Sequence, residues 1–169
     1  MIAPFTYTIH PTPIGPLLLV AEGASLVAIR YVEKRAKLPA LLAAMMGPAA
    51  EATEDPKALA RFATALDDYF AGKAKALRFP TRFRHGTELQ RAVWEALATI
   101  PYGRTLSYSA LAARVGKPRA VRAVASACAA NPLPLVFPCH RVIAKDGSLG
   151  GFSLGGVTVK AQLLAQEQA

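Results

Sequence analysis

Apolar and polar residues alternate at the start of the chain, and the pattern then changes to a helical period. The segments FTYTIH, GPLLLVAEG and SLVAIRYV are short, apolar on alternate positions or throughout, and bounded by Pro or Gly, which predicts strands of a small sheet. In residues 56–72, apolar residues recur every three to four positions and predict a helix with one buried face. That face holds Leu59, Phe62, Leu66, Tyr69 and Phe70.

A domain boundary is predicted in the irregular segment KAKALRFPTRFRHG. The two sides differ in charge: residues 1–80 hold nine Lys or Arg against seven Asp or Glu, whereas residues 81–169 hold eleven against four. We place the boundary near residues 78–86, between a first domain of residues 1–80 and a second of residues 86–169. Strands followed by helices predict a mixed α/β (α+β) fold class.

Helical patterns dominate the start of the second domain. The segment TELQRAVWEALATI opens with the spacing of a capping box and carries apolar residues along one face. Ser107 can cap a short helix that Gly116 ends, and Lys117 and Pro118 are expected to start the next helix. A helix, a tight turn and a second helix are typical of a helix-turn-helix DNA-binding motif.

The last of these helices is predicted to be amphipathic, because successive residues are rotated by about 100°. Its buried face holds Val121, Val124, Ala125 and Cys128. Its exposed face holds Arg119, Arg122, Ala123 and Ser126. Small residues and arginines on one face suit close approach to a nucleic-acid groove, although helix pairs with a basic outer face are at least as common in other proteins.

Composition and charge narrow the class of protein. Hydrophobic residues make up 53% of the chain, which supports a packed core, and no apolar run approaches the roughly 18 residues of a membrane span. The start lacks the basic opening of a secretory signal, so we expect a cytoplasmic protein without a membrane partner. Residues 96–145 hold Arg104 and other basic residues but no acidic one. Such a stretch suits a phosphate-rich partner, although it is about as often only a solvated face.

The cysteines and histidines predict free thiols and no metal site. Cys128 and Cys139 stand in a chain without a secretion signal, so reduced thiols are favoured over a disulfide. Cys128 lies on a buried helical face and is expected to be inert packing. His10 and His85 are isolated, so no ligand set for zinc and no other cofactor is predicted.

Cys139 is the candidate nucleophile. In PLVFPCHRVI it follows a proline and precedes His140 and Arg141. A neutral thiol is a poor nucleophile, and the neighbouring imidazole and guanidinium groups are expected to lower its pKa. Adjacent side chains in an extended segment point apart, so Cys139 and His140 can cooperate only if the chain turns here or a water bridges them.

Glu167 is the candidate partner of His140. It follows Leu163 by four residues and Leu164 by three, which places it on the side of the last helix that those leucines bury. A buried carboxylate needs a partner, and a Glu behind the imidazole would orient it as an acceptor of the thiol proton. The alternative is a solvated Glu, which spacing alone does not exclude.

Residues 91–152 and the segment KAQLLAQE closely resemble the O6-alkylguanine-DNA alkyltransferases, also called methylated-DNA:protein-cysteine methyltransferases. The most specific part is the signature NPLPLVFPCHRVI. The segment TPIGPLLLVA also resembles the opening strands of that family's first domain. The resemblance implies a ribonuclease H-like N-terminal domain with a small sheet and a helix, and a C-terminal winged-helix or helix-turn-helix domain that holds the active site.

The resemblance also implies an activity. Members bind damaged double-stranded DNA through the minor groove, rotate the alkylated guanine out of the stack, and move its alkyl group irreversibly to a cysteine, here Cys139. His140, acting through a water, and Glu167 would activate this thiol. Tyr108, which spacing alone places in the core, would protonate the departing guanine. Asn131 would brace the turn under the active-site segment.

Further roles follow from the same resemblance. Arg122 would fill the gap that the flipped base leaves. The other residues assigned to DNA contact are Arg119, Ser126 and Arg104. In the pocket, the backbone of Ser153 would donate to the alkylated oxygen, and main-chain carbonyls near Cys139 and Val142 would accept from the exocyclic amine of the guanine.

This sequence departs from the family pattern at several positions. Phe152 stands where many members carry Tyr, which removes a hydroxyl from the pocket wall. Ala125, and Ala129 or Ala130, stand where the family usually has Gly, so the recognition helix is bulkier. These departures are expected to change the range of alkyl groups accepted and to leave the reacting atoms in place.

Several functions remain open. The leading one is a monomeric, single-turnover methyltransferase acting on O6-methylguanine, larger adducts and O4-methylthymine. A related binder that flags lesions without repair would carry Trp in place of Cys139. A transcriptional regulator of this family would need an additional cysteine-rich module. A thiol hydrolase would need an oxyanion pocket and leaves the basic helix without a purpose.

Overall fold

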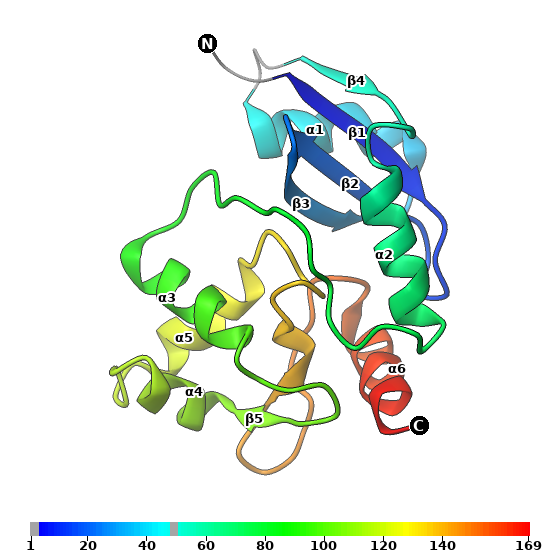
Figure 1. Ribbon diagram of the computed structural model, residues 1–169. Helices are drawn as coiled ribbons and strands as arrows, with labels where there is room; N and C mark the ends of the chain where they lie inside the picture. Colours follow the sequence, from blue (N-terminus) through cyan, green and yellow to red (C-terminus); the bar gives the residue numbers. More distant parts are fainter. Residues whose placement is uncertain (1–3, 48–50) are drawn as a thin grey trace. The chain divides into compact units, whose positions relative to one another are not determined.

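The computed structural model describes residues 4–47 and 51–169 (Figure 1). The chain divides into two compact units, Met1–Arg82 and Phe83–Ala169. Residues 1–3 of the predicted first domain lie outside the described residues. A sheet with helices forms the first unit and helices dominate the second, which confirms the mixed α+β fold class. No helix in the two described ranges combines the length and the apolar character that crossing a membrane requires.

The first unit is built on an antiparallel sheet with one parallel edge strand. β1 (Phe5–His10) pairs antiparallel with β2 (Leu17–Glu22), which pairs antiparallel with β3 (Ser25–Tyr31). These are the strands that the alternating pattern predicts. The pattern does not predict β4 (Ala52–Glu54), because three residues are too few to show an alternation. β4 pairs parallel with β1, which gives the order β3-β2-β1-β4.

Helices complete the core of the first unit. α2 (Ala60–Phe70) buries the predicted apolar face except for Phe70, which is half-buried. α1 (Leu38–Met46) follows a 3-10 turn, η1 (Arg35–Lys37), and its two buried ends join a core cluster with strand residues. The helical period of α1 is not visible in the sequence, because this segment is apolar on every side and no polar face marks the turns.

Helices dominate the second unit. Its helices are α3 (Glu88–Leu97), α4 (Tyr108–Arg114), α5 (Val121–Ala129) and α6 (Gly156–Gln168). A short parallel strand pair and a 3-10 turn complete it: β5 (Leu106–Ser107), β6 (Val142–Ile143) and η2 (Cys139–Arg141).

The core of the second unit forms around Trp94 of α3. Its side chain is fully buried, and its indole Nε1 donates a hydrogen bond to the carbonyl of Ala127 in α5 at 2.8 Å. The ring of Phe83 lies 4.9 Å from that of Trp94 and 4.8 Å from that of Phe137, between centroids. The hydrogen bond between Trp94 and Ala127 fixes α5, the helix that carries Arg122, against α3.

The predicted starts of α3 and α4 are present. Thr87 accepts a hydrogen bond from the amide of Gln90 at 3.1 Å, and the side chain of Gln90 accepts one from the amide of Thr87 at 2.9 Å. The hydroxyl of Ser107 accepts from the amide of Ala110 at 3.0 Å. This second cap makes Tyr108 the first residue of α4.

α5 begins at Val121, not at Lys117 as the sequence pattern predicts. The amide of Lys117 donates to the carbonyl of Ala112 at 2.8 Å and closes the end of α4, where Gly116 has a left-handed φ of 76°. The chain must then make a turn before a new helix can begin. Arg119 therefore lies in this exposed turn and not on a face of α5.

Candidate active site

A cavity of about 370 Å³ opens in the second unit. Its lining comes from α4, α5, η2 and the loop that leads into α6, and consists of Tyr108, Ala125, Cys128, Ala129, Cys139, Gly150, Gly151, Phe152 and Ser153. Most of these side chains are small or apolar, and a few polar groups lie among them. An apolar cavity of this size with few polar groups is typical of a binding site for a small molecule.

One turn of 3-10 helix places Cys139 on the wall of this cavity. The chain turns here, as cooperation between neighbouring side chains requires. Cys139 lines the cavity, whereas His140 and Arg141 reach Glu167 of α6. Residues that are adjacent in the sequence therefore face different surroundings.

Asn131 braces the segment that leads to this turn. Its Nδ2 donates to the carbonyl of Phe137 at 2.7 Å, and its Oδ1 accepts from the amide of Leu133 at 2.9 Å. Its side chain also forms a hydrogen bond with Cys139. Within the segment, Leu135 has a φ of 76°, a conformation that costs a non-glycine residue roughly 1–3 kcal/mol and persists only where the surroundings hold it.

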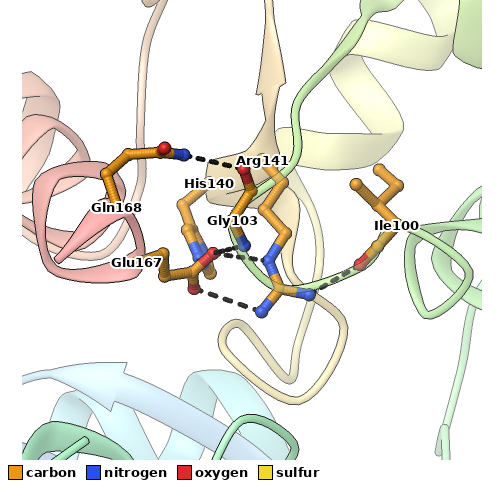
Figure 2. Close-up of polar contacts among 6 residues, drawn as sticks. All are labelled: Ile100, Gly103, His140, Arg141, Glu167 and Gln168. Carbon is orange, nitrogen blue, oxygen red and sulfur yellow. Dashed lines mark hydrogen bonds and ion pairs between the residues drawn. The ribbon is translucent and has the colours of Figure 1, made fainter.

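Figure 2 shows the carboxylate of Glu167 surrounded by donors. Nε2 of His140 donates to Oε2 at 2.7 Å, Nε and Nη2 of Arg141 donate to Oε1 at 2.8 Å and Oε2 at 3.1 Å, and the amide of Gly103 donates to Oε1 at 3.3 Å. Gln168 donates to the carbonyl of Gly103 at 2.7 Å, which ties the end of α6 to the turn after α3. The structure thus contains the predicted contact between His140 and Glu167, and Glu167 is only 5% exposed, so it is not solvated.

This pairing sets the tautomer of His140. Because a carboxylate only accepts, Nε2 carries the proton and Nδ1 holds a lone pair. Nδ1 is buried and has no hydrogen-bond partner among the described groups of the protein. Burial lowers the pKa of His140, Glu167 opposes this shift, and the charges of Arg141 and Lys160 add to it. The neutral imidazole therefore presents a buried acceptor.

Burial raises the pKa of Cys139, contrary to the prediction that the imidazole and guanidinium beside it in the sequence lower it. The guanidinium of Arg141 is engaged elsewhere, and its Nη1 donates to the carbonyl of Ile100 at 2.6 Å. The hydrogen bond from Asn131 and the charge of Lys160 lower the pKa of Cys139, but by less than burial raises it. The thiol is therefore protonated at neutral pH, and it needs a base to become a nucleophile.

Tyr108 is half-buried on the cavity wall. It packs against the core of the second unit, as its spacing predicts, and also lines the cavity. Burial and the thiolate charges of Cys128 and Cys139 raise the pKa of Tyr108. The phenol therefore keeps its proton at neutral pH and can act as a proton donor.

Lys160 is a buried cation of the site that sequence reasoning does not single out. Its Nζ donates to the carbonyl of Val142 at 2.6 Å and to that of Leu149, and it lies 3.5 Å from the hydroxyl of Tyr108. The sequence does carry a signal, because Lys160 precedes Leu163 by three residues and so shares its buried face. These contacts close the loop between Val142 and Leu149.

Two of the three residues that the sequence assigns to the pocket line the cavity, and both lie in the loop before α6. Phe152 and Ser153 line the cavity. Val142, whose carbonyl is expected to bind the guanine, is not among the lining residues; its side chain is buried in the core cluster, and its carbonyl accepts a hydrogen bond from Lys160.

α5 contributes to the cavity wall as well as to the exposed face. Ala125 and Ala129 line the cavity, so their methyl groups narrow it, whereas Ala130 is exposed and is not among the lining residues. Cys128 is buried in the core cluster, as expected for a packing residue, and it also lines the cavity. Burial raises the pKa of Cys128 to about 12, which keeps this second thiol protonated.

The residues assigned to DNA contact are all exposed: Arg104, Arg119, Arg122 and Ser126. Arg122 and Ser126 lie on the same helix, α5, with the exposed methyl group of Ala123 between them in the sequence. Arg104 lies in the turn after α3. Within the described residues, no group of three or more His, Cys, Asp or Glu side chains could hold a metal ion.

Fold and site together define a class of protein in which a helix-turn-helix unit carries a buried Cys, His and Glu at an apolar cavity. Residues 88–169 match a family model described as "6-O-methylguanine DNA methyltransferase, DNA binding domain". Residues 5–83 match the model of the same family's "ribonuclease-like domain". The chain belongs to the 6-O-methylguanine DNA methyltransferase family.

Relatives along the full chain support this assignment. The methylated-DNA–protein-cysteine methyltransferase of Methanosarcina barkeri is 37% identical over 164 residues, which cover 96% of this chain and 96% of that protein. The crystal structure of Mycobacterium tuberculosis O6-methylguanine methyltransferase has a TM-score of 0.84 at 37% identity. The match covers 97% of this chain and 93% of the mycobacterial chain. The crystal structure of Mycobacterium tuberculosis OGT in complex with DNA has a TM-score of 0.83 at 37% identity, and the match covers 96% of this chain and 92% of the mycobacterial chain.

Proposed function

We propose that the protein repairs alkylated DNA by transferring the alkyl group of O6-alkylguanine in duplex DNA to Sγ of its own Cys139. The observation that carries this proposal is the thiol of Cys139 on the cavity wall, with the buried pair of His140 and Glu167 next to it in the fold. The reaction is a single turnover, since the thioether that forms does not return to a free thiol. The methyltransferase names of the full-length relatives support the same activity.

Duplex DNA binds along the exposed face of α5. Arg122 and Ser126 lie on this face, and Ala125 and Ala129 of the same helix line the cavity. A base rotated out of the stack beside α5 can therefore enter the cavity, while Arg122 fills the gap it leaves. Arg104, Arg119 and the other exposed cations supply charge for the phosphates.

Proton removal from Cys139 starts the reaction. Nδ1 of neutral His140 is a buried acceptor, and it takes the thiol proton through a bridging water. Glu167 holds the ring in the required tautomer and stabilises the imidazolium that forms. Asn131 and Lys160 stabilise the thiolate.

The thiolate then displaces the guanine. Sγ of Cys139 attacks the alkyl carbon, the bond between that carbon and O6 breaks, and its electron pair stays on the guanine. The hydroxyl of Tyr108 donates its proton to the departing base, so the base leaves as neutral guanine. Lys160, 3.5 Å from that hydroxyl, stabilises the phenolate that remains.

The same step applies to other alkyl groups on an exocyclic oxygen. O4-methylthymine is a second expected substrate, because the displaced base again accepts a proton as it leaves.

All side chains of the proposed mechanism come from one chain, which supports action as a monomer. We propose that the protein acts in the cytoplasm.

Intact-protein mass spectrometry tests the proposal. The protein is mixed with excess duplex DNA containing one O6-methylguanine, with Cys139→Ala as the matched variant, and the products are mapped by peptide. We expect a single gain of one CH2, on Cys139, and none in the variant. A protein that binds the lesion tightly but gains no mass would show a damage sensor without transferase activity.

A further inference from the structure

Arg141 follows His140, the proposed base, directly in the sequence. Its guanidinium nevertheless donates hydrogen bonds to the carboxylate of Glu167 and not to the thiol of Cys139. Nε and Nη2 donate to the two oxygens of Glu167, and Nη1 donates to the carbonyl of Ile100 (Figure 2). We propose that Arg141 is a positioning residue, which compensates the charge of Glu167 so that His140 stays a neutral base at physiological pH. This inference rests on the proposed function.

The hydrogen bonds of Glu167 leave no place for a further proton. Its carboxylate accepts from Nε and Nη2 of Arg141, from His140 and from the amide of Gly103. An ionised carboxylate has about four acceptor sites, so these donors saturate it. Glu167 can therefore orient His140 but cannot take the Nε2 proton from it.

Burial contributes most to keeping the ring of His140 neutral, and the charges around the ring act in both directions. One anion, Glu167, and two cations, Arg141 and Lys160, act on the ring, and the thiol of Cys139 is neutral at rest. A buried histidine beside an uncompensated carboxylate would bind a proton and form an ion pair. The guanidinium adds to the effect of burial by sharing the carboxylate, so that Nδ1 keeps a lone pair that can accept a proton.

The shape of arginine suits this position. Its planar fork matches both oxygens of Glu167, and its third nitrogen is held by Ile100, which fixes the plane. A lysine would keep the charge but lose the two-point contact. The charge and the geometry of Arg141 can therefore be tested separately.

The test is the pH dependence of methyl transfer from duplex O6-methylguanine, from about pH 5 to 9 around the usual titration range of histidine. The variants are Arg141→Gln and Arg141→Lys, and the control is Arg91→Gln, which removes an exposed arginine on α3 of the same unit. In Arg141→Gln we expect the acid-side inflection of the rate to move up by roughly one to three pH units. Arg141→Lys should keep the inflection close to that of the wild type at a lower rate, and Arg91→Gln should match the wild type.

A purely structural role for Arg141 would lower the rate at every pH and leave the inflection in place. That result, or equal shifts in the Gln and Lys variants, would overturn the inference. A wild type without methyl transfer would instead refute the proposed function itself.

A measurement on the wild type covers the case in which Arg141→Gln does not fold. The 15N shifts of the His140 ring report its protonation state and tautomer. We expect a neutral ring with the proton on Nε2 at pH 7, and an imidazolium or an Nδ1 proton at that pH would overturn the inference.

Discussion

Replacing Glu167 with Gln removes a negative charge from between two buried donors and leaves the size of the side chain unchanged. The amide has one acceptor oxygen and one NH2 group, so its NH2 must face either His140 or the fork of Arg141. Both groups donate in the wild type, and a donor that faces a donor leaves a buried hydrogen bond unmade. Arg141 also loses its counter-charge.

The expected loss of stability follows from burial. Glu167 is 5% exposed and Arg141 is 6% exposed, so the pair counts as buried, and removal of one partner of such a pair costs about 3–5 kcal/mol. Free energies of unfolding span about 5–15 kcal/mol, so a domain in the upper part of that range stays folded after a loss of this size. The base loses its oriented tautomer, and general base catalysis contributes about 10²–10⁴-fold, so the rate of methyl transfer should fall by that factor.

Two assays check Glu167→Gln. Urea unfolding gives the change in the free energy of unfolding, and rapid mixing with duplex O6-methylguanine gives the second-order rate constant of transfer. Glu95→Gln is the matched control, because Glu95 is exposed on α3 and its change alters net charge equally. A Glu167→Gln protein within tenfold of the wild-type rate, or less than 1 kcal/mol less stable, would refute the reasoning.

The exposed face of α5 and the cavity wall can be probed by single changes. Arg122→Ala should slow transfer from duplex DNA about tenfold to a hundredfold, because flipping costs a few kcal/mol, and should spare transfer from a free alkylguanine base; equal losses on both substrates would contradict its role in the duplex. Ala129→Leu should fill part of the cavity and slow transfer of a bulky adduct more than that of methyl, as competition between two labelled duplexes would show. Cys128, with a pKa raised to about 12, should resist iodoacetamide in the folded protein at pH 7 to 9 and become reactive only as the pH approaches that pKa; peptide mapping that finds early labelling would contradict its burial.

Local side-chain chemistry made parts of the fold predictable. The caps at Thr87 and Ser107 act within three residues, so the sequence alone locates the starts of α3 and α4. The start of α5 cannot be located from neighbouring residues in this way, because the amide of Lys117 donates to the carbonyl of Ala112 and so closes α4. α1 has no polar face, so its turns leave no periodic signal.

The candidate site was predictable where the chemistry of one residue implied another. Glu167 on a buried face required a donor, and His140 was the natural partner. The direction of the Arg141 guanidinium was not predictable, since it depends on how η2 turns beside α6. Lys160 was missed because a lysine is seldom fully buried, and only the fold shows the carbonyls of the loop that surround it.

α6 follows every other element of the site in the sequence, and it brings both Lys160 and Glu167. A ribosome therefore releases Cys139 before the groups that orient its base and stabilise its thiolate. In the proposed mechanism the thiol is therefore an ordinary cysteine of low reactivity during synthesis, and it is activated only when α6 packs against η2. For a protein whose cysteine reacts once, the order of translation would thus delay activation of the thiol until the last helix, α6, is made and packed.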